Sequence, residues 1–394
     1  MMQRRKQTTG ISDRGITDRN KSDGIRSGKT IRTEQQTRDW VRLIRDQRWS
    51  NAQKLRLLDK FQTPAGVYRR SSGQITKLLK SRIQHRAPVA CDADIAGEMR
   101  WLAQSPHSLI TINDSQYPVL LKQIHDPPIA LFAKGDLTCL GDPKVAIVGS
   151  RRPSPVGSKF ARMLAHGLAD IGVVVTSGMA LGIDGAAHLG AIDAGSPTVA
   201  VMGCGLDTIY PPRHRELFEQ ISTSGCLLSE YPLGAPPSRY HFPVRNRIVS
   251  GLSLGVIVIE AAERSGTLVT ARLAIEQNRE LMVVPGSALS QQYQGSHSLI
   301  KQGAAIVTRV EDVVELLSTP LTITLRKNCQ HHESTAATLP ESPLLTFIGY
   351  ESTSVDEIIL ASGLTAAEVS SMLLMLEVEG SIATADDGGY VRLC

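Results

Sequence analysis

Long hydrophobic runs are missing from this chain of 394 residues. No apolar stretch approaches the roughly 18 residues that a membrane-spanning helix needs, and the polar N-terminus lacks the apolar core of a secretory signal. Hydrophobic residues still make up 42% of the chain, which is typical of a globular protein with a sizeable core. We therefore expect a cytoplasmic protein without a membrane partner, and the length favours two to four domains.

Paired cysteines are also missing. The six cysteines are scattered and form no C-x-x-C pair, which argues against both a zinc site and a disulfide framework. A reducing compartment is the simplest reading of such cysteine usage. The residues are Cys91, Cys139, Cys204, Cys226, Cys329 and Cys394.

Familiar catalytic and nucleotide-binding motifs are absent as well. Neither a Gly-x-Ser-x-Gly nucleophile elbow nor a Gly-x-Gly-x-x-Gly follows the first expected parallel strand. Residues 23–30 approach a Walker A loop but have three residues between the glycines where the motif needs four. Asp184 and His188 lie four residues apart on an expected helix, yet no third ligand is near, so a capping Asp and a packed His are favoured. We expect no catalytic residue, no cofactor and no metal.

Positive charge is concentrated at one end. Residues 1–38 hold ten Lys/Arg and four Asp/Glu, a net charge of +6, whereas the remaining 356 residues hold 33 and 34, a net charge of −1. The first 38 residues also contain almost no apolar side chains, which predicts a disordered basic tail.

Four further regions follow the tail. Apolar residues at helical spacing predict a small helical domain of helix-hairpin type over residues 39–105, which could touch DNA or simply pack. Residues 106–318 alternate short apolar runs with helical segments, which predicts an α/β fold with a Rossmann-like, doubly wound, mostly parallel sheet. Residues 319–340 lack periodicity and form a linker. Residues 341–394 have the pattern of a winged-helix domain.

Small, backbone-exposing residues follow the expected strands of the α/β region. Residues 145–148 run into Gly149, Ser150 and Arg151, and a helical pattern begins near Gly157. Carboxyl ends of parallel strands share one edge of a sheet, where ligands bind, and helix N-termini at that edge attract anions. Glycine-rich turns also serve packing alone, but their number here favours an anion site. The other expected turns on this edge contain Ser177-Gly178, Gly203-Cys204-Gly205, Glu230–Gly234, Glu260–Thr267 with Ser265-Gly266, and Pro285-Gly286.

A basic loop carries two of the few aromatic residues, which make up only 4% of the chain. Cations follow a phosphate backbone while ring faces stack on bases, which is how single strands are held without sequence readout. The alternative is a loop clamped by Arg–carboxylate pairs with Phe242 in the core. The loop, residues 238–247, contains Arg239, Tyr240, Phe242, Arg245, Asn246 and Arg247.

The second helix expected in the winged domain, capped by Thr365, has no Lys or Arg and contains Glu368 and Glu377. A helix that reads DNA needs cations for phosphates and polar side chains for bases. This composition favours a module that contacts protein.

Taken together, these motifs resemble the DprA (Smf) family of DNA-processing proteins over roughly residues 107–317. The resemblance is carried by the series Tyr117-Pro118, Asp126–Pro128, Gly149–Arg151, Ser177–His188, Tyr210-Pro211, Ser229–Pro232, Phe242–Arg247, Glu260, Ser265–Thr267, Thr270-Ala271 and Pro285-Gly286.

The resemblance implies a Rossmann-like domain that binds single-stranded DNA, forms a homodimer and helps load the RecA recombinase during natural transformation. By the same resemblance, Ser150 and Arg151 would hold a phosphate and Ser177 and Gly178 would line the same pocket. Arg239 and Phe242 would supply a cation and a stacking ring. His297 departs from the family pattern, which usually has Asn there.

An enzymatic alternative uses the same general fold. Phosphoribohydrolases that hydrolyse nucleotides place an acidic residue near a glycine-rich loop, much as Glu260 precedes Ser265-Gly266-Thr267 here. Their Pro-Gly-Gly loop is absent from this chain, so the expected function is binding without catalysis.

Overall fold

The computed structural model describes residues 32–80, 91–318, 343–349, 353–378, 381–384 and 389–392. The chain divides into two compact units, residues 1–326 and residues 327–394, and each is described by itself. The expected linker over residues 319–340 and most of the expected tail lie outside the described residues. No helix in the described part of the chain is long and apolar enough to cross a membrane.

The first unit begins with five helices: α1 (Glu34–Arg45), α2 (Asn51–Phe61), α3 (Pro64–Tyr68), α4 (Ser72–Leu79) and α5 (Asp92–Leu102). Three of them start at a reciprocal capping box, in which a Ser or Thr side chain and a Gln side chain each bond the other residue's backbone N–H. The predicted disordered tail ends too late, because α1 already begins at Glu34. The Thr33–Gln36 capping box and an i,i+4 pair between Glu34 and Arg38 stabilise this first turn.

A nine-stranded sheet forms the body of the unit, with the strand order β1-β2-β6-β5-β4-β3-β7-β8-β9. Strands β3 to β9 are parallel to one another and coincide with expected apolar runs. Strands β1 and β2 form an antiparallel edge next to β6 that the apolar runs did not predict. The expected doubly wound, mostly parallel α/β fold is therefore confirmed. The strands are β1 (His107–Thr111), β2 (Ala130–Gly135), β3 (Lys144–Gly149), β4 (Val174–Ser177), β5 (Thr198–Val201), β6 (Cys226–Ser229), β7 (Gly255–Ile259), β8 (Glu280–Val283) and β9 (Ala305–Ile306).

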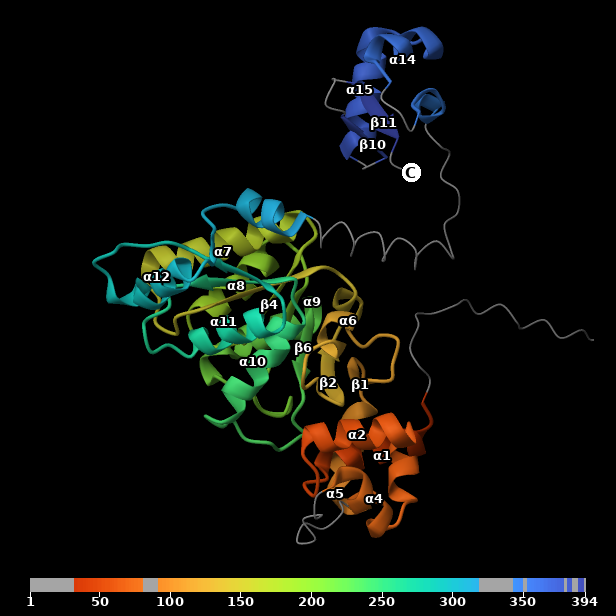
Figure 1. Ribbon diagram of the computed structural model, residues 1–394, viewed down its shortest axis with the longest axis vertical. Helices are drawn as coiled ribbons and strands as arrows, with labels where there is room; N and C mark the ends of the chain where they lie inside the picture. The colour runs from red at the N-terminus through yellow and green to blue at the C-terminus, as the bar shows by residue number, and fades with distance from the viewer. Residues whose placement is uncertain are drawn as a thin grey trace, which may run out of the picture. The chain divides into compact units, whose positions relative to one another are not determined.

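Helices cover both faces of the sheet because its central strands are apolar on both sides. In β3, Val145 and Ile147 pack against α7 (Pro155–Asp170) and α8 (Ile183–Asp193), whereas Ala146 and Val148 belong to the core on the opposite face. That second face is covered by α10 (His241–Gly251) and α11 (Thr267–Glu276), as Figure 1 shows. The remaining helices of this unit include α6 (Val119–Lys122), α9 (Arg215–Ser224) and α12 (Gln294–Lys301).

The strand order changes direction at β3. From β3 the chain moves outward through β4, β5 and β6, then returns to place β7 on the other side of β3. The carboxyl ends of β3 and β7 therefore border a topological switch point, which is the usual position of a ligand crevice in an open parallel sheet.

The second unit has its own small core, formed by residues that include Leu344, Ile358, Val369 and Ile382. Its elements are the 3-10 turn η4 (Pro343–Phe347), α14 (Val355–Ser362), α15 (Ala366–Val378), β10 (Ile382–Thr384) and β11 (Tyr390–Arg392). The last two pair in antiparallel fashion, which gives the expected wing. Gly363 ends α14 with a φ of 68°, the left-handed conformation that glycine adopts at low cost.

Candidate nucleic-acid interface

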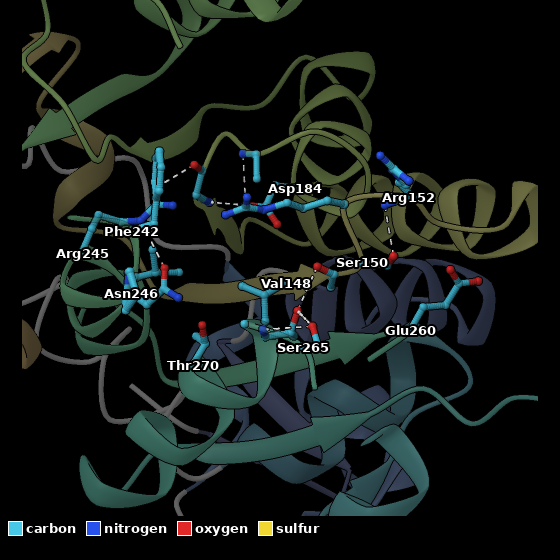
Figure 2. Close-up of a pocket in the computed structure, with 18 of the residues that line it drawn as sticks. Val148, Ser150, Arg152, Asp184, Phe242, Arg245, Asn246, Glu260, Ser265 and Thr270 are labelled. Atoms are coloured by element: carbon cyan, nitrogen blue, oxygen red, sulfur yellow. Dashed lines mark hydrogen bonds between the residues drawn. The ribbon is translucent and has the colours of Figure 1, made fainter. Parts of the chain in front are cut away.

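A pocket of about 750 Å³ opens at the switch point. Figure 2 shows Phe242, Arg245 and Asn246 reaching in from α10 on one side, with Ser150, Arg152 and Glu260 on the other. Eleven of the thirteen binding residues expected from the sequence line this pocket: Gly149, Ser150, Arg151, Gly178, Arg239, Phe242, Arg245, Asn246, Ser265, Gly266 and Thr267.

The floor of the pocket depends on Gly149, the last residue of β3. A Cβ at this position would lie 1.9 Å from the carbonyl oxygen of Ile259, so only glycine lets the ends of β3 and β7 come together. Thr267 at the start of α11 donates its hydroxyl to the Gly149 carbonyl at 2.9 Å, and Ser265 Oγ accepts from the Thr267 N–H at 3.1 Å. These bonds hold the N-terminus of α11 against the end of β3, where its dipole faces the pocket.

The turn after β4 is held by two buried charged side chains. Asp184 accepts hydrogen bonds from the backbone N–H groups of Gly178 and Ala180, at 3.1 and 3.2 Å. Arg245 donates from Nη1 to the carbonyls of Gly178, at 2.6 Å, and Val201. A Cβ on Gly178 would lie 2.7 Å from the Arg245 guanidinium, so glycine is required for this close approach.

Burial changes the pKa of both charged groups. It raises the pKa of Asp184, against the opposing effects of Arg245 and the two backbone N–H donors. It lowers the pKa of Arg245, which the carboxylate of Asp184 counteracts. Arg245 therefore lines the pocket as a fixed cation whose main bonds are to the fold itself.

The aromatic side of the pocket is a stacked pair. The ring of Phe242 lies on that of Tyr210 with centroids 5.5 Å apart and an angle of 27° between the planes. The guanidinium carbon of Arg151 lies 5.5 Å from the Phe242 ring centroid. Residues 241–247 of the expected basic loop belong to α10. Phe242 is half-buried and not in the core, so this helix presents a ring next to a cation at the pocket wall.

Three further cations reach the pocket from exposed positions: Arg151, Arg152 and Arg239. Within the described ranges, none of them forms an ion pair with a carboxylate, although Arg239 donates to the hydroxyl of Tyr240 at 2.8 Å. Because their guanidinium groups face solvent, a bound anion could take their free N–H donors.

Glu260 occupies the far end of the pocket and is fully buried. Its carboxylate accepts from the Ser154 N–H at 2.7 Å, from the Ser154 hydroxyl, and from the Tyr293 hydroxyl at 3.0 Å. Its φ of 55° is unusual for a residue with a side chain. These bonds make Glu260 an anchor for the N-terminus of α7, whose first residues follow Ser154.

Two residues expected at the site lie elsewhere. Ser177 is buried, and its hydroxyl donates to the Ile147 carbonyl at 2.6 Å, which ties β4 to β3. Arg247 forms a two-bonded ion pair with Glu230, with both N–O distances 2.7 Å, and donates from Nε to the carbonyl of Asp126 at 2.9 Å. Neither side chain lines the pocket.

The structure also gives the positions of Asp184, His188 and His297, three residues singled out in the sequence. Asp184 caps the turn after β4, as described above, and His188 is fully buried with Nδ1 2.8 Å from the Thr198 hydroxyl. His297 bonds the carbonyl of Gly286 at 3.1 Å, away from the pocket. No cluster of three or more His, Cys, Asp or Glu residues suited to a metal ion occurs in the described part of the chain.

The pocket residues that sequence reasoning did not predict include a cation, Arg152, and an aromatic residue, Tyr210. Arg152 directly follows Arg151, and its place in the same turn was a usable signal. Tyr210 reaches Phe242 across more than thirty residues, so only the folded chain brings the two rings together.

The fold and the pocket define a class: Rossmann-like proteins that present a cationic, glycine-lined site at the switch point of a doubly wound sheet. A family model described as DNA recombination-mediator protein A matches residues 108–318, and one described as the DprA winged helix domain matches residues 331–388. The chain belongs to the DprA family.

Individual relatives agree with this assignment. Protein Smf of Escherichia coli (strain K12) is 44% identical over 303 residues, which cover 76% of this chain and 81% of that protein. The DNA processing protein DprA of Streptococcus pneumoniae (strain ATCC BAA-255 / R6) is 46% identical over 204 residues, covering 52% and 72%. The X-ray structure of DprA from Streptococcus pneumoniae matches with a TM-score of 0.59 and 35% identity, over 72% of this chain and 97% of that one.

Proposed function

We propose that this protein binds single-stranded DNA at the switch-point pocket, without sequence readout and without catalysis. The observation that carries the proposal is the pairing of exposed cations with a stacked aromatic side chain: Arg151 lies beside Phe242, and Arg239 lines the same pocket. Phosphates bind cations, while the ring face accepts any base by stacking.

The geometry supports binding over nucleotide hydrolysis. In the alternative function Glu260 would act as the acidic catalytic group, but both of its carboxylate oxygens are already bonded to Ser154 and Tyr293. A general base needs a lone pair directed at the group it deprotonates.

Family membership supports a wider role. We propose that the bound strand is DNA entering recombination, which the protein protects and passes to the RecA recombinase during transformation, with a homodimer as the active form. The family description, DNA recombination-mediator protein A, and the relatives named DNA processing protein DprA support this role.

The winged domain is the best candidate for the protein-contact part of this function. Residues 341–394 contain nine Asp or Glu residues and a single Lys or Arg, Arg392. A surface with so few cations is a poor match for a phosphate backbone and a good match for a basic protein surface.

The decisive experiment is a fluorescence anisotropy titration of the full chain with labelled single-stranded and hairpin-duplex oligonucleotides at several salt concentrations. We expect tighter binding of single strands, equal affinity across base sequences, and a log–log salt slope of about −0.7 per neutralised phosphate. Equal affinity for the duplex, or affinity that does not depend on salt, would refute the proposal.

A further inference from the structure

Charges in the helical domain are distributed unevenly. The cations of α1 form ion pairs, and the two shortest pairs to α5 join Arg42 to Asp92 at 2.6 Å and Arg45 to Glu98 at 2.5 Å. Just beyond α1, Arg48 likewise pairs with Asp46, at 2.7 Å. This side of the domain is close to electrically balanced.

The segment that contains α2, α3 and α4 is different. Residues 51–80 contain six exposed cations and one acidic residue, Asp59. No carboxylate in the described ranges lies within ion-pair distance of any of the six. We call them the α2–α4 cations: Arg56, Lys60, Arg69, Arg70, Lys77 and Lys80.

Their spacing makes them repel one another. Arg56 and Lys60 are one turn apart on α2, and Lys77 and the residue after α4, Lys80, are three positions apart. Like charges at such spacings destabilise a helix unless a counter-charge is bound. Helix α2 contacts both α3 and α4, so the six charges lie on one small group of packed helices.

Hydrogen bonds attach the helical domain to the α/β domain. Arg45 at the end of α1 donates to the carbonyl of Leu233 at 2.9 Å, and Asn51 at the start of α2 bonds Asp126 at 2.7 Å. Leu233 precedes Arg239 in the segment that enters the pocket. The helical domain is therefore bonded to the segment that leads into the pocket.

We propose that the α2–α4 cations form a second binding surface, which takes the phosphate backbone of the nucleic acid outside the pocket. The inference rests on the proposed function and extends it, because it gives the bound DNA a longer footprint than the pocket alone. The backbone could belong to the same single strand or to a duplex arm that adjoins it, since both present the same phosphate chemistry.

The test uses the full chain with Lys60→Gln, Arg69→Gln and Lys77→Gln combined. The matched control removes three exposed, unpaired cations from elsewhere in the same unit, with Lys122→Gln, Arg272→Gln and Lys301→Gln. Both variants lose the same net charge, so a difference between them reports position and not overall electrostatics. Thermal melting of both confirms that the domain still folds.

Three labelled probes separate the possibilities. An oligonucleotide of about 6 nucleotides, near the lower end of single-strand site sizes, fills the pocket alone, whereas one of about 30 nucleotides or a hairpin with a short single-stranded tail extends beyond it. We expect the α2–α4 variant to bind the short probe normally. It should lose about 10-fold or more in affinity for an extended probe, with a salt slope about 2 units shallower.

A loss confined to the long single strand identifies that strand as the occupant, and a loss confined to the hairpin identifies the duplex arm. Equal affinities of the variant and its control for all three probes would overturn the inference. Failure of the proposed function looks different: Arg151→Ala would then leave the affinity for the short probe unchanged.

Discussion

Replacing Arg247 with alanine tests whether this side chain holds the fold or the DNA. Its guanidinium makes two bonds of 2.7 Å to Glu230, and the two side chains keep only 10% and 13% of their exposure. Removing one partner of a buried ion pair costs about 3–5 kcal/mol, because the other charge is left uncompensated. Since the pair is not fully closed from water, we expect a loss of about 3 kcal/mol in the free energy of unfolding.

A loss of this size is easy to measure. For a domain of roughly 150–250 residues, each kcal/mol lowers Tm by about 2–4 °C, so Arg247→Ala should lower Tm by about 6–12 °C. The DNA affinity of the folded variant and its salt slope, measured by anisotropy well below Tm, should stay those of the natural chain. Arg239→Ala is the control, since it removes the same charge from an exposed position and should leave Tm nearly unchanged.

Adding Glu230→Gln to Arg247→Ala should recover part of the lost stability, because it removes the unpaired charge. The reasoning would be refuted if Arg247→Ala kept its Tm within about 2 °C and instead flattened the salt slope by about 0.7, the value of one phosphate contact.

Other substitutions and conditions should separate charge, stacking and packing. Arg151→Ala should weaken DNA binding equally for all base sequences and flatten the salt slope by about 0.7. Phe242→Ala should cost about 1–3 kcal/mol of binding free energy and leave the salt slope unchanged. A Phe242→Ala variant with full affinity and a lower Tm would place the ring in the core. Burial, with His214 and Arg245 nearby, lowers the pKa of His188 to about 3. The unfolded chain therefore takes up a proton below about pH 6.5 that the folded chain does not, so unfolding should become about 3 kcal/mol easier between pH 6.5 and 4, and His188→Asn should reduce this dependence in pH-resolved chemical denaturation. Truncation to residues 1–326, the first compact unit, should keep DNA affinity within a few-fold, and a larger loss in the titration would show that the winged unit contacts DNA.

Local patterns in the sequence were enough to predict the class of fold. Apolar runs such as residues 145–148 alternate with helical segments, and this alternation leaves a parallel sheet covered on both faces as the simplest way to bury them. The same logic placed Gly149 and Gly178 at one edge of the sheet, because carboxyl ends of parallel strands meet there. The antiparallel edge strands β1 and β2 were not predicted, and only the pairing of β2 with the distant strand β6 attaches them to the sheet.

Which charges face the pocket was decided only by tertiary structure. Arg245 and Arg247 are two residues apart in the segment that the sequence predicts as one basic loop, and no local pattern distinguishes them. Because α10 is a helix, residues two positions apart point in different directions, so Arg245 enters the pocket while Arg247 meets Glu230 on another side. The stacking of Phe242 on Tyr210 likewise needed the fold, because no local pattern relates two rings that lie more than thirty residues apart.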